Sequence, residues 1–106
     1  MKKTLSTIDC LNLFSLKEYL ALIGIEPTHE RSDSTDYQVQ LDGDSPTFIT
    51  VDHDKNHFTE PARNRKGYLV DFACLLFGCT PEDLCGNIAR YRIDLLMQQA
   101  FQRPAA

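Results

Sequence analysis

The chain has 106 residues, of which 42% are hydrophobic and 25% are charged, and its formal net charge is -4 at pH 7. This length fits a single domain over residues 1–106, and the hydrophobic share is sufficient for a core without metal or disulfides. The acidic balance argues against strong non-specific DNA binding over the whole surface, because such binding depends on Lys and Arg neutralising phosphates. A local basic patch remains compatible with this charge.

The first predicted helix has signals at both ends. Ser15 is a candidate N-cap, and Glu18 three residues later completes a capping-box pattern. Gly24 fits the left-handed position that follows a helix end, and Pro27 prevents the helix from continuing. Residues 1–13 carry no strong signal of their own.

Three short strands are predicted in the middle of the chain. Residues 37–41 alternate between apolar and polar side chains, and residues 47–51 form a second candidate strand. Residues 57–59 follow a polar turn and can pair back as a third strand. The polar stretch 28–35 and the basic stretch 61–66 are predicted to be loops. A small antiparallel sheet of about three strands follows.

Two helices are predicted in the last third of the chain. Residues 68–77 are apolar nearly all round, as expected of a buried helix, and Gly78 ends them. Thr80 is a candidate N-cap with Pro81 at the first helical position, and the helix is predicted to extend over residues 81–101. The fold class is therefore predicted to be α+β, with the sheet flanked by an N-terminal helix and two C-terminal helices, without metal.

Two segments of the predicted sheet and helix match the pattern of a known domain. They are Ser45-Pro46-Thr47-Phe48 and Gly67-Tyr68-Leu69-Val70-Asp71-Phe72. They resemble the "Thr-Pro-Ser-Phe" and "Gly-x-x-Ile-Asp-Phe" segments of the zinc-binding domain that begins bacterial DNA primases, and the resemblance covers about residues 14–90. Ungapped counting places the family's four zinc ligands at Gln38, Leu41, Glu60 and Arg63. Leu and Arg cannot ligate zinc, so the resemblance implies a zinc-ribbon-like scaffold without zinc, similar to primase-like proteins of mobile elements.

Neither a metal site nor a catalytic centre is predicted. His53 and His57 flank a predicted turn and form no tetrahedral ligand set, and a calcium-loop pattern fails where Arg63 replaces the bidentate Glu. The cysteines match no zinc or redox spacing and are predicted to be buried thiols: Cys10, Cys74, Cys79 and Cys85. Asp71 is predicted to be a structural hydrogen-bonding residue. The chain has no phosphate-binding loop, so we expect neither an enzyme nor a cofactor.

Nucleic-acid binding is the first functional prediction. The basic loop precedes a predicted helix start, where N–H groups and the helix dipole favour an anion. The candidate residues are Arg63, Arg65, Lys66, Lys55 and His57. Phe58 or Tyr37 would offer a stacking surface for bases, unless both rings lie in the core. The primase resemblance implies single-stranded DNA as the ligand, or the recruitment of replication or mobilisation proteins.

The alternative prediction is a protein-interaction or dimerisation module with no nucleic-acid role. The last predicted helix carries a second apolar row, with Ile93, Met97 and Phe101, which is more than one sheet face needs. Such a row would dock on a partner or on a second copy, unless the first helix and residues 11–13 cover it.

No segment is expected to enter a membrane. The basic start Met1-Lys2-Lys3 is not followed by the apolar region of a signal peptide. The longest apolar run, residues 68–77, is too short to span a bilayer. We therefore predict a cytoplasmic protein.

Overall fold

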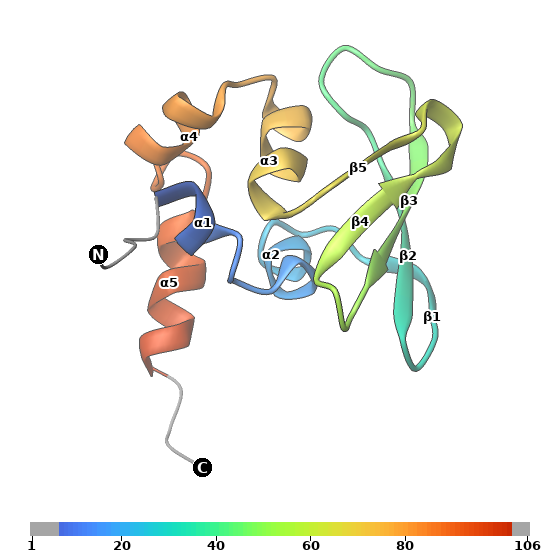
Figure 1. Ribbon diagram of the computed structural model, residues 1–106, viewed down its shortest axis with the longest axis horizontal. Helices are drawn as coiled ribbons and strands as arrows, with labels where there is room; N and C mark the ends of the chain where they lie inside the picture. The colour runs from blue at the N-terminus through green and yellow to red at the C-terminus, as the bar shows by residue number, and fades with distance from the viewer. Residues whose placement is uncertain (1–6, 103–106) are drawn as a thin grey trace, which may run out of the picture.

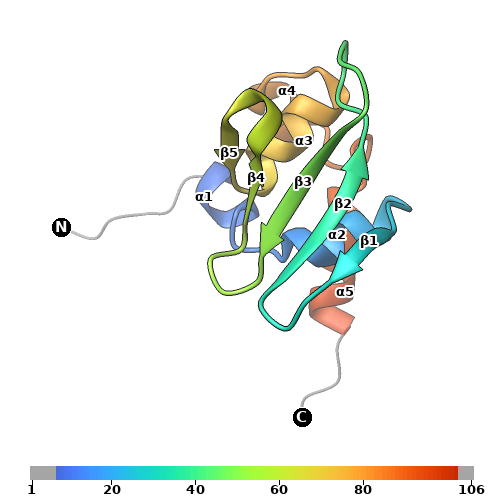
Figure 2. The same ribbon diagram turned by 90° about the vertical axis from the view of Figure 1, so that its right-hand side faces the viewer.

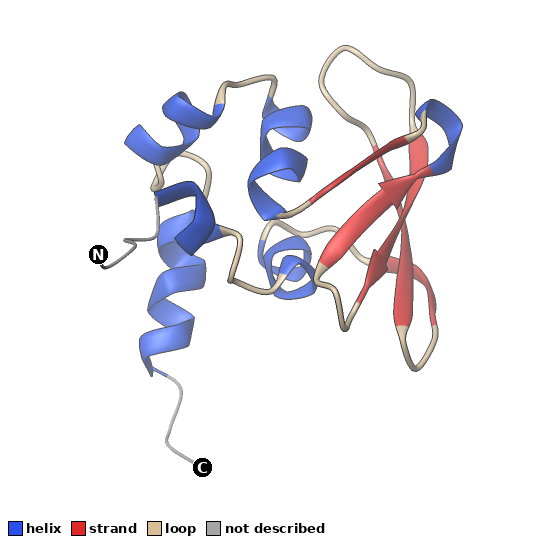
Figure 3. Ribbon diagram, viewed as in Figure 1, coloured by secondary structure: helices blue, strands red, loops and turns tan. Residues whose placement is uncertain are grey.

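A five-stranded antiparallel sheet forms one side of the molecule and the helices form the other (Figure 1, Figure 3). The computed structural model describes residues 7–102, with the backbone alone for residues 100–102. The strands are β1 (Pro27–Glu30), β2 (Ser34–Val39), β3 (Thr47–Asp52), β4 (His57–Glu60) and β5 (Arg65–Gly67). Each strand pairs with the next one along the chain, so the sheet is a meander in the order β1-β2-β3-β4-β5.

The helices pack on one face of this sheet. They are α1 (Thr7–Leu11), α2 (Leu16–Leu22), α3 (Leu69–Phe77), α4 (Pro81–Gly86) and α5 (Ile93–Gln102), and a 3-10 turn η1 (Pro61–Arg63) precedes β5. Figure 1 shows α2 and α3 beside the sheet, with α1, α4 and α5 beyond them. In Figure 2 the opposite face of the sheet is turned to the viewer, and no helix of the described part of the chain covers it. The predicted α+β class is confirmed.

The sheet has five strands, and the prediction of about three was wrong. The predicted strands correspond to β2, β3 and β4. The stretch 28–35, predicted to be a loop, contains most of β1 and the start of β2. All four residues of β1 are exposed, so they lack the apolar alternation that marks a strand in sequence. The stretch 61–66 was also predicted to be a loop, but its last two residues belong to β5, which pairs with β4.

The single helix predicted over residues 81–101 is two helices, α4 and α5, with a turn between them. The turn closes through the Ile93 N–H, which donates to the Ile88 carbonyl at 2.9 Å, and Arg92 has a φ of 65°. The break has a packing reason. On one straight helix, the two apolar rows of this segment would face different directions. The turn reorients the second row, so that Leu84 and Ile93 both reach the core and are fully buried.

Alternation along the strands builds the core between the sheet and the helices. Tyr37 of β2, Ile49 of β3 and Phe58 of β4 are each at most 2% exposed. Phe58 packs edge-to-face against Phe72 of α3, with ring centroids 5.7 Å apart. Phe48, the last residue of the segment Ser45-Pro46-Thr47-Phe48, points the other way and is 59% exposed, because its neighbours in β3 point inward. An aromatic ring therefore lies on the open face of the sheet.

The predicted helix ends are confirmed. The Ser15 hydroxyl accepts the Glu18 N–H at 3.1 Å, and the Thr80 hydroxyl caps α4 in the same way. Gly24 and Gly78 follow α2 and α3 with φ values of 86° and 65°, a conformation that costs glycine little. These local signals hold because they depend on residues close together in the chain.

Asp71 has the structural role predicted for it. Its carboxylate accepts the Tyr68 N–H at 2.9 Å, at the start of α3. A Cβ atom on Gly67 would lie 2.5 Å from the Asp71 Cβ, so the turn from β5 into α3 requires glycine here. This close turn fixes the position of Tyr68.

Two asparagines connect the β3–β4 turn to the helices. The Asn56 amide accepts the Leu16 N–H at 2.8 Å and donates to the carbonyls of Asn12 and Phe14 at 3.2 and 2.8 Å. The Asn12 side chain in turn accepts the Val70 N–H at 2.9 Å, at the start of α3. The bonds tie the hairpin, the α1–α2 connection and α3 together.

The four cysteines are free thiols, but they are not buried as predicted. Cys10 is exposed, whereas Cys74, Cys79 and Cys85 are partly buried. Burial raises the pKa of Cys74 to about 12, so this thiol stays protonated and unreactive at neutral pH.

Candidate nucleic-acid interface

Four side chains from the β4–β5 end of the sheet line one pocket, which we call the basic cleft. They are Lys55, His57, Lys66 and Tyr68. The cleft has a volume of about 500 Å³. Lys55 comes from the β3–β4 turn, His57 begins β4, Lys66 lies in β5 and Tyr68 follows it. The antiparallel pairing of β4 with β5 brings these positions together, although they are up to 13 residues apart in the chain.

The aromatic part of the basic cleft is accessible. Tyr68 is 48% exposed, and its ring centroid lies 6.2 Å from that of His57, with the rings tilted by 48°. The Nδ1 atom of His57 is buried and has no hydrogen-bond partner among the described residues. The cleft thus combines an exposed aromatic ring with an imidazole whose Nδ1 atom is shielded from solvent.

The charge of the basic cleft is positive. Within residues 7–102, none of the ion pairs involves Lys55 or Lys66. The carboxylate of Asp52 lies nearby and accepts the backbone N–H of Lys55 at 2.9 Å. This bond, followed by smaller effects that include the charges of Lys55 and His57, lowers the pKa of Asp52. The side chains that line the cleft include two ammonium groups and no carboxylate, so the cleft is suited to an anion.

The two arginines of the predicted site are held inside an ion network. Glu60 is fully buried, and its two carboxylate oxygens accept from Arg63 Nη1 at 2.6 Å and from Arg65 Nε at 2.7 Å. Arg65 also donates to Asp44 at 2.9 Å, and Arg63 lies 4.0 Å from the same carboxylate. Two cations therefore face two carboxylates. We call these four residues the Glu60 network.

The pKa of Glu60 reflects this balance. Burial alone would raise the pKa of the Glu60 carboxyl, but hydrogen bonds from Arg65, Arg63 and Thr47 outweigh burial and lower it. Glu60 is therefore ionised at neutral pH and compensates much of the charge of both arginines. Of the five predicted basic residues, Lys55, His57 and Lys66 line the basic cleft, whereas the two arginines do not line it and are paired with carboxylates.

The aromatic rings expected to stack on bases are not accessible. Phe58 is fully buried and Tyr37 is 2% exposed, so both belong to the core. Among the described residues, the exposed rings are Phe48, Tyr68 and Phe77, none of which was predicted to stack on bases. A signal for Phe48 was present, because the β-branched residues on either side of it mark the inward face of β3.

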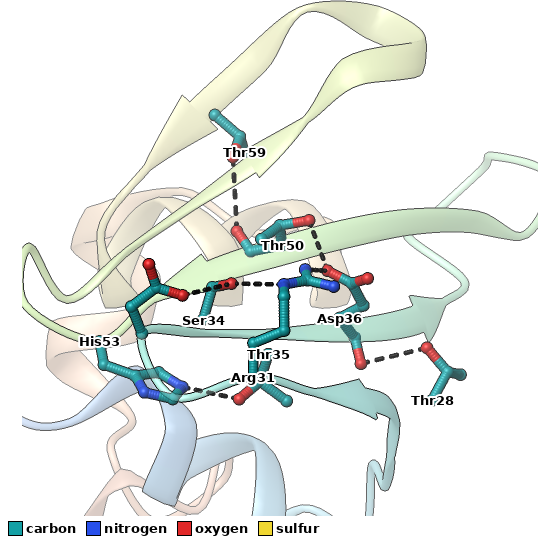
Figure 4. A network of polar contacts seen from close by, with 9 residues as sticks. Thr28, Arg31, Ser34, Thr35, Asp36, Thr50, His53 and Thr59 are labelled. Carbon is teal, nitrogen blue, oxygen red and sulfur yellow. Dashed lines mark hydrogen bonds and ion pairs between the residues drawn. The ribbon is translucent and has the colours of Figure 1, made fainter.

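Polar side chains occupy the open face of the sheet. Figure 4 shows Asp36 of β2 bound by Arg31 and by the Thr50 hydroxyl, which lies 2.8 Å from the carboxylate. The Thr59 hydroxyl of β4 donates to the Thr50 carbonyl. Hydrogen bonds from Arg31 and Thr50 lower the pKa of Asp36. The charge of this carboxylate is thus offset by a neighbouring guanidinium.

The positions that ungapped counting assigns to zinc ligands do not form a metal site. Gln38 is exposed on β2, and Leu41 is 1% exposed in the core. The other two, Glu60 and Arg63, form an ion pair with each other. Within residues 7–102, no group of three or more His, Cys, Asp or Glu side chains is placed to hold a metal ion.

The apolar row predicted as an interaction surface is partly core. Ile93 is fully buried, and Met97 is partly buried against the core cluster. The side chain of Phe101 lies outside the described residues. Because the turn before α5 directs this row toward α2, the prediction that Ile93 is part of an exposed docking surface was wrong.

Comparison of this chain with protein-family models, with curated proteins and with solved structures gives no match. Among the helices within residues 7–102, none has the length and apolar character needed to cross a membrane.

Proposed function

We propose that this chain is a non-catalytic protein that binds single-stranded DNA at the basic cleft. The observation that carries the proposal is the exposed ring of Tyr68 in a pocket that is also lined by Lys55 and Lys66, two lysines outside the ion pairs of the described residues. The bases of an unpaired strand stack on aromatic rings, and the phosphates beside them pair with ammonium groups. Both contacts are available within one pocket.

The open face of the sheet supports a single strand as the ligand. Phe48 of β3 provides an exposed ring on this face, and the hydroxyls of Thr50 and Thr59 lie on β3 and β4. Arg31 offsets the charge of Asp36, which reduces repulsion of phosphates. A broad surface with exposed rings suits splayed bases, whereas reading a duplex requires an element that enters a groove.

We further propose that the chain is a metal-free, zinc-ribbon-like relative of the primase zinc-binding domain. In that role it would hold a template strand or recruit replication or mobilisation proteins of a mobile element. The support is the placement of the two matching segments, one leading into β3 and the other forming the start of α3. The Glu60 network, which joins two of the four counted ligand positions, is a source of cohesion that requires no metal.

Lys55→Ala/Lys66→Ala is expected to weaken binding of a fluorescently labelled oligo(dT) and to reduce its salt dependence. Each lost phosphate contact lowers the slope of log K against log[salt] by about 0.7 for a single strand, so two lost contacts lower it by about 1.4. The measurement is fluorescence anisotropy over a salt series. Lys17→Ala/Arg90→Ala is the matched control, because it removes two positive charges outside the cleft.

Tyr68→Ala is expected to separate stacking from charge. Loss of one base–ring stack costs about 1–3 kcal/mol, which weakens binding by about fivefold to more than a hundredfold, while the salt slope stays that of the wild type. Equal weakening by the control variant, or wild type that does not bind at low salt, would contradict the proposal. Absence of binding together with a dimeric mass would favour the protein-interaction alternative.

A further inference from the structure

A second pocket lies where the end of α2, the end of α3 and the turn before α5 meet. Its volume is about 470 Å³, within the roughly 300–1,000 Å³ typical of ligand pockets. Its side-chain walls are apolar except for one cation: Leu22, Ile23, Ile25, Leu76, Phe77 and Arg92. None of these residues belongs to the basic cleft or the Glu60 network.

Arg92 has an unusual backbone conformation at this pocket. Its φ is 65°, and it is the one residue within 7–102 with positive φ that is neither Gly nor Asn. The Arg92 N–H donates to the Ala89 carbonyl at 3.2 Å, and the following N–H donates to the Ile88 carbonyl at 2.9 Å, which is the pattern of a helix C-terminus. After α2 and α3 the corresponding left-handed positions hold Gly24 and Gly78. Arg thus occupies a place where Gly is energetically easier.

The charge of Arg92 is not used within the described fold. No ion pair between described residues includes Arg92 or its neighbour Arg90. The Arg90 guanidinium lies 5.8 Å from the ring centroid of Tyr91, and that ring lies 5.2 Å from the ring of Phe77 in the pocket wall. The guanidinium of Arg92 therefore lines an apolar pocket and has no carboxylate partner among the described residues, and this charge pattern is complementary to an acidic ligand.

We propose that this pocket docks a segment of a partner protein that carries a large apolar side chain beside an acidic residue. The apolar side chain enters between Ile25 and Phe77, and the carboxylate pairs with Arg92. A residue other than Gly or Asn that is held at positive φ strains the backbone, and such strain is typical of binding sites. The strained conformation of Arg92 destabilises the fold slightly, and its side chain is then available to bind the ligand. This surface is separate from the basic cleft, so the inference does not depend on DNA binding.

The test is selection from a random dodecapeptide library displayed on phage, with the full-length wild-type chain as the target. We expect enriched peptides in which Leu, Ile or Phe stands next to Asp or Glu. A synthetic peptide from this set should bind Arg92→Gly at least tenfold more weakly than wild type, and Leu76→Ala should also weaken it. Lys17→Ala, which removes a distant charge, should bind as wild type does.

Arg92→Gly also separates binding from folding. Because glycine favours positive φ, this variant should have a Tm equal to or above that of the wild type while it loses the peptide. A lower Tm, an enriched set without acidic residues, or unchanged binding to Arg92→Gly would overturn the proposal. So would selection that enriches no peptide. Competition of the peptide by oligo(dT) would contradict the separation of the two sites.

Discussion

Arg65→Ala is expected to destabilise the fold by about 3 kcal/mol, which is the low end of the range for removing one partner of a buried ion pair. Glu60 has no exposed side-chain surface and receives charged hydrogen bonds from Arg63 and Arg65. Without Arg65, one oxygen of a buried carboxylate loses its donor and Asp44 loses its closest cation. Arg63 remains, so the loss stays below that of an isolated buried charge. Chemical denaturation of wild type and variant measures the effect.

A rescue experiment tests whether charge causes this loss. Glu60→Gln removes the negative charge and retains an acceptor, so Arg65→Ala should cost less in that background than in the wild type. Equal costs in both backgrounds would show that Arg65 acts through the packing of its aliphatic stem. Arg65→Ala is therefore a poor probe of DNA binding, because a folding defect would mimic lost affinity.

The Glu60 network also predicts how stability depends on pH. The pKa of Glu60 is lowered in the folded state, so its stabilising contribution is present above the unfolded pKa of about 4.3 and disappears as the pH falls through the lower folded value. Wild type should therefore lose more stability than Glu60→Gln between about pH 5 and pH 2. The measurement is the free energy of unfolding of both proteins over this range. Parallel curves would contradict the assignment.

Asn56→Ala is expected to destabilise the fold by about 3–4 kcal/mol. The substitution removes three hydrogen bonds worth about 1 kcal/mol each and places Ala at a φ of 54°. These bonds join the β3–β4 turn to the α1–α2 connection, so their loss affects the contact of the sheet with the helices.

Two further variants divide this effect into its parts. Asn56→Gly keeps the backbone conformation and loses the bonds, so it should be about 1 kcal/mol more stable than Asn56→Ala. Asn56→Asp keeps the acceptor for the Leu16 N–H and loses both donors. If all three variants had wild-type denaturation midpoints, the connecting role of Asn56 would be wrong.

The sequence predicts most of what depends on neighbouring residues. The caps at Ser15 and Thr80 and the glycine at position 24 are local signals, and the alternation of apolar and polar residues in β2, β3 and β4 spans four to six residues. β1 was not predicted because its strand conformation is stabilised by pairing with β2, and it has no apolar face that the sequence would reveal. The break before α5 was not predicted because Arg92 has a left-handed backbone conformation, which Gly indicates in a sequence and Arg does not.

The candidate site is predictable in part for the same reason. Lys55, His57 and Lys66 were recognisable as basic residues near a hairpin, but Arg63 and Arg65 carry the same signal and are not equivalent to them. Their carboxylate partners become visible only in three dimensions, since Asp44 lies 21 residues before Arg65 and Glu60 reads as a surface residue in sequence. The sequence therefore identifies the basic segment, while the fold pairs its two arginines with carboxylates and places Lys66 in the basic cleft.

The most direct measurement of the central claim is a heteronuclear NMR titration of the ¹⁵N-labelled chain with oligo(dT) at low salt. Binding at the basic cleft predicts that the backbone amides of Lys55, His57, Lys66 and Tyr68 shift progressively and saturate. The Nε–H signal of Arg65, which is bound to Glu60, should stay in place. Shifts confined to other surfaces, or a spectrum that oligo(dT) leaves unchanged, would contradict a single-stranded DNA site in this cleft.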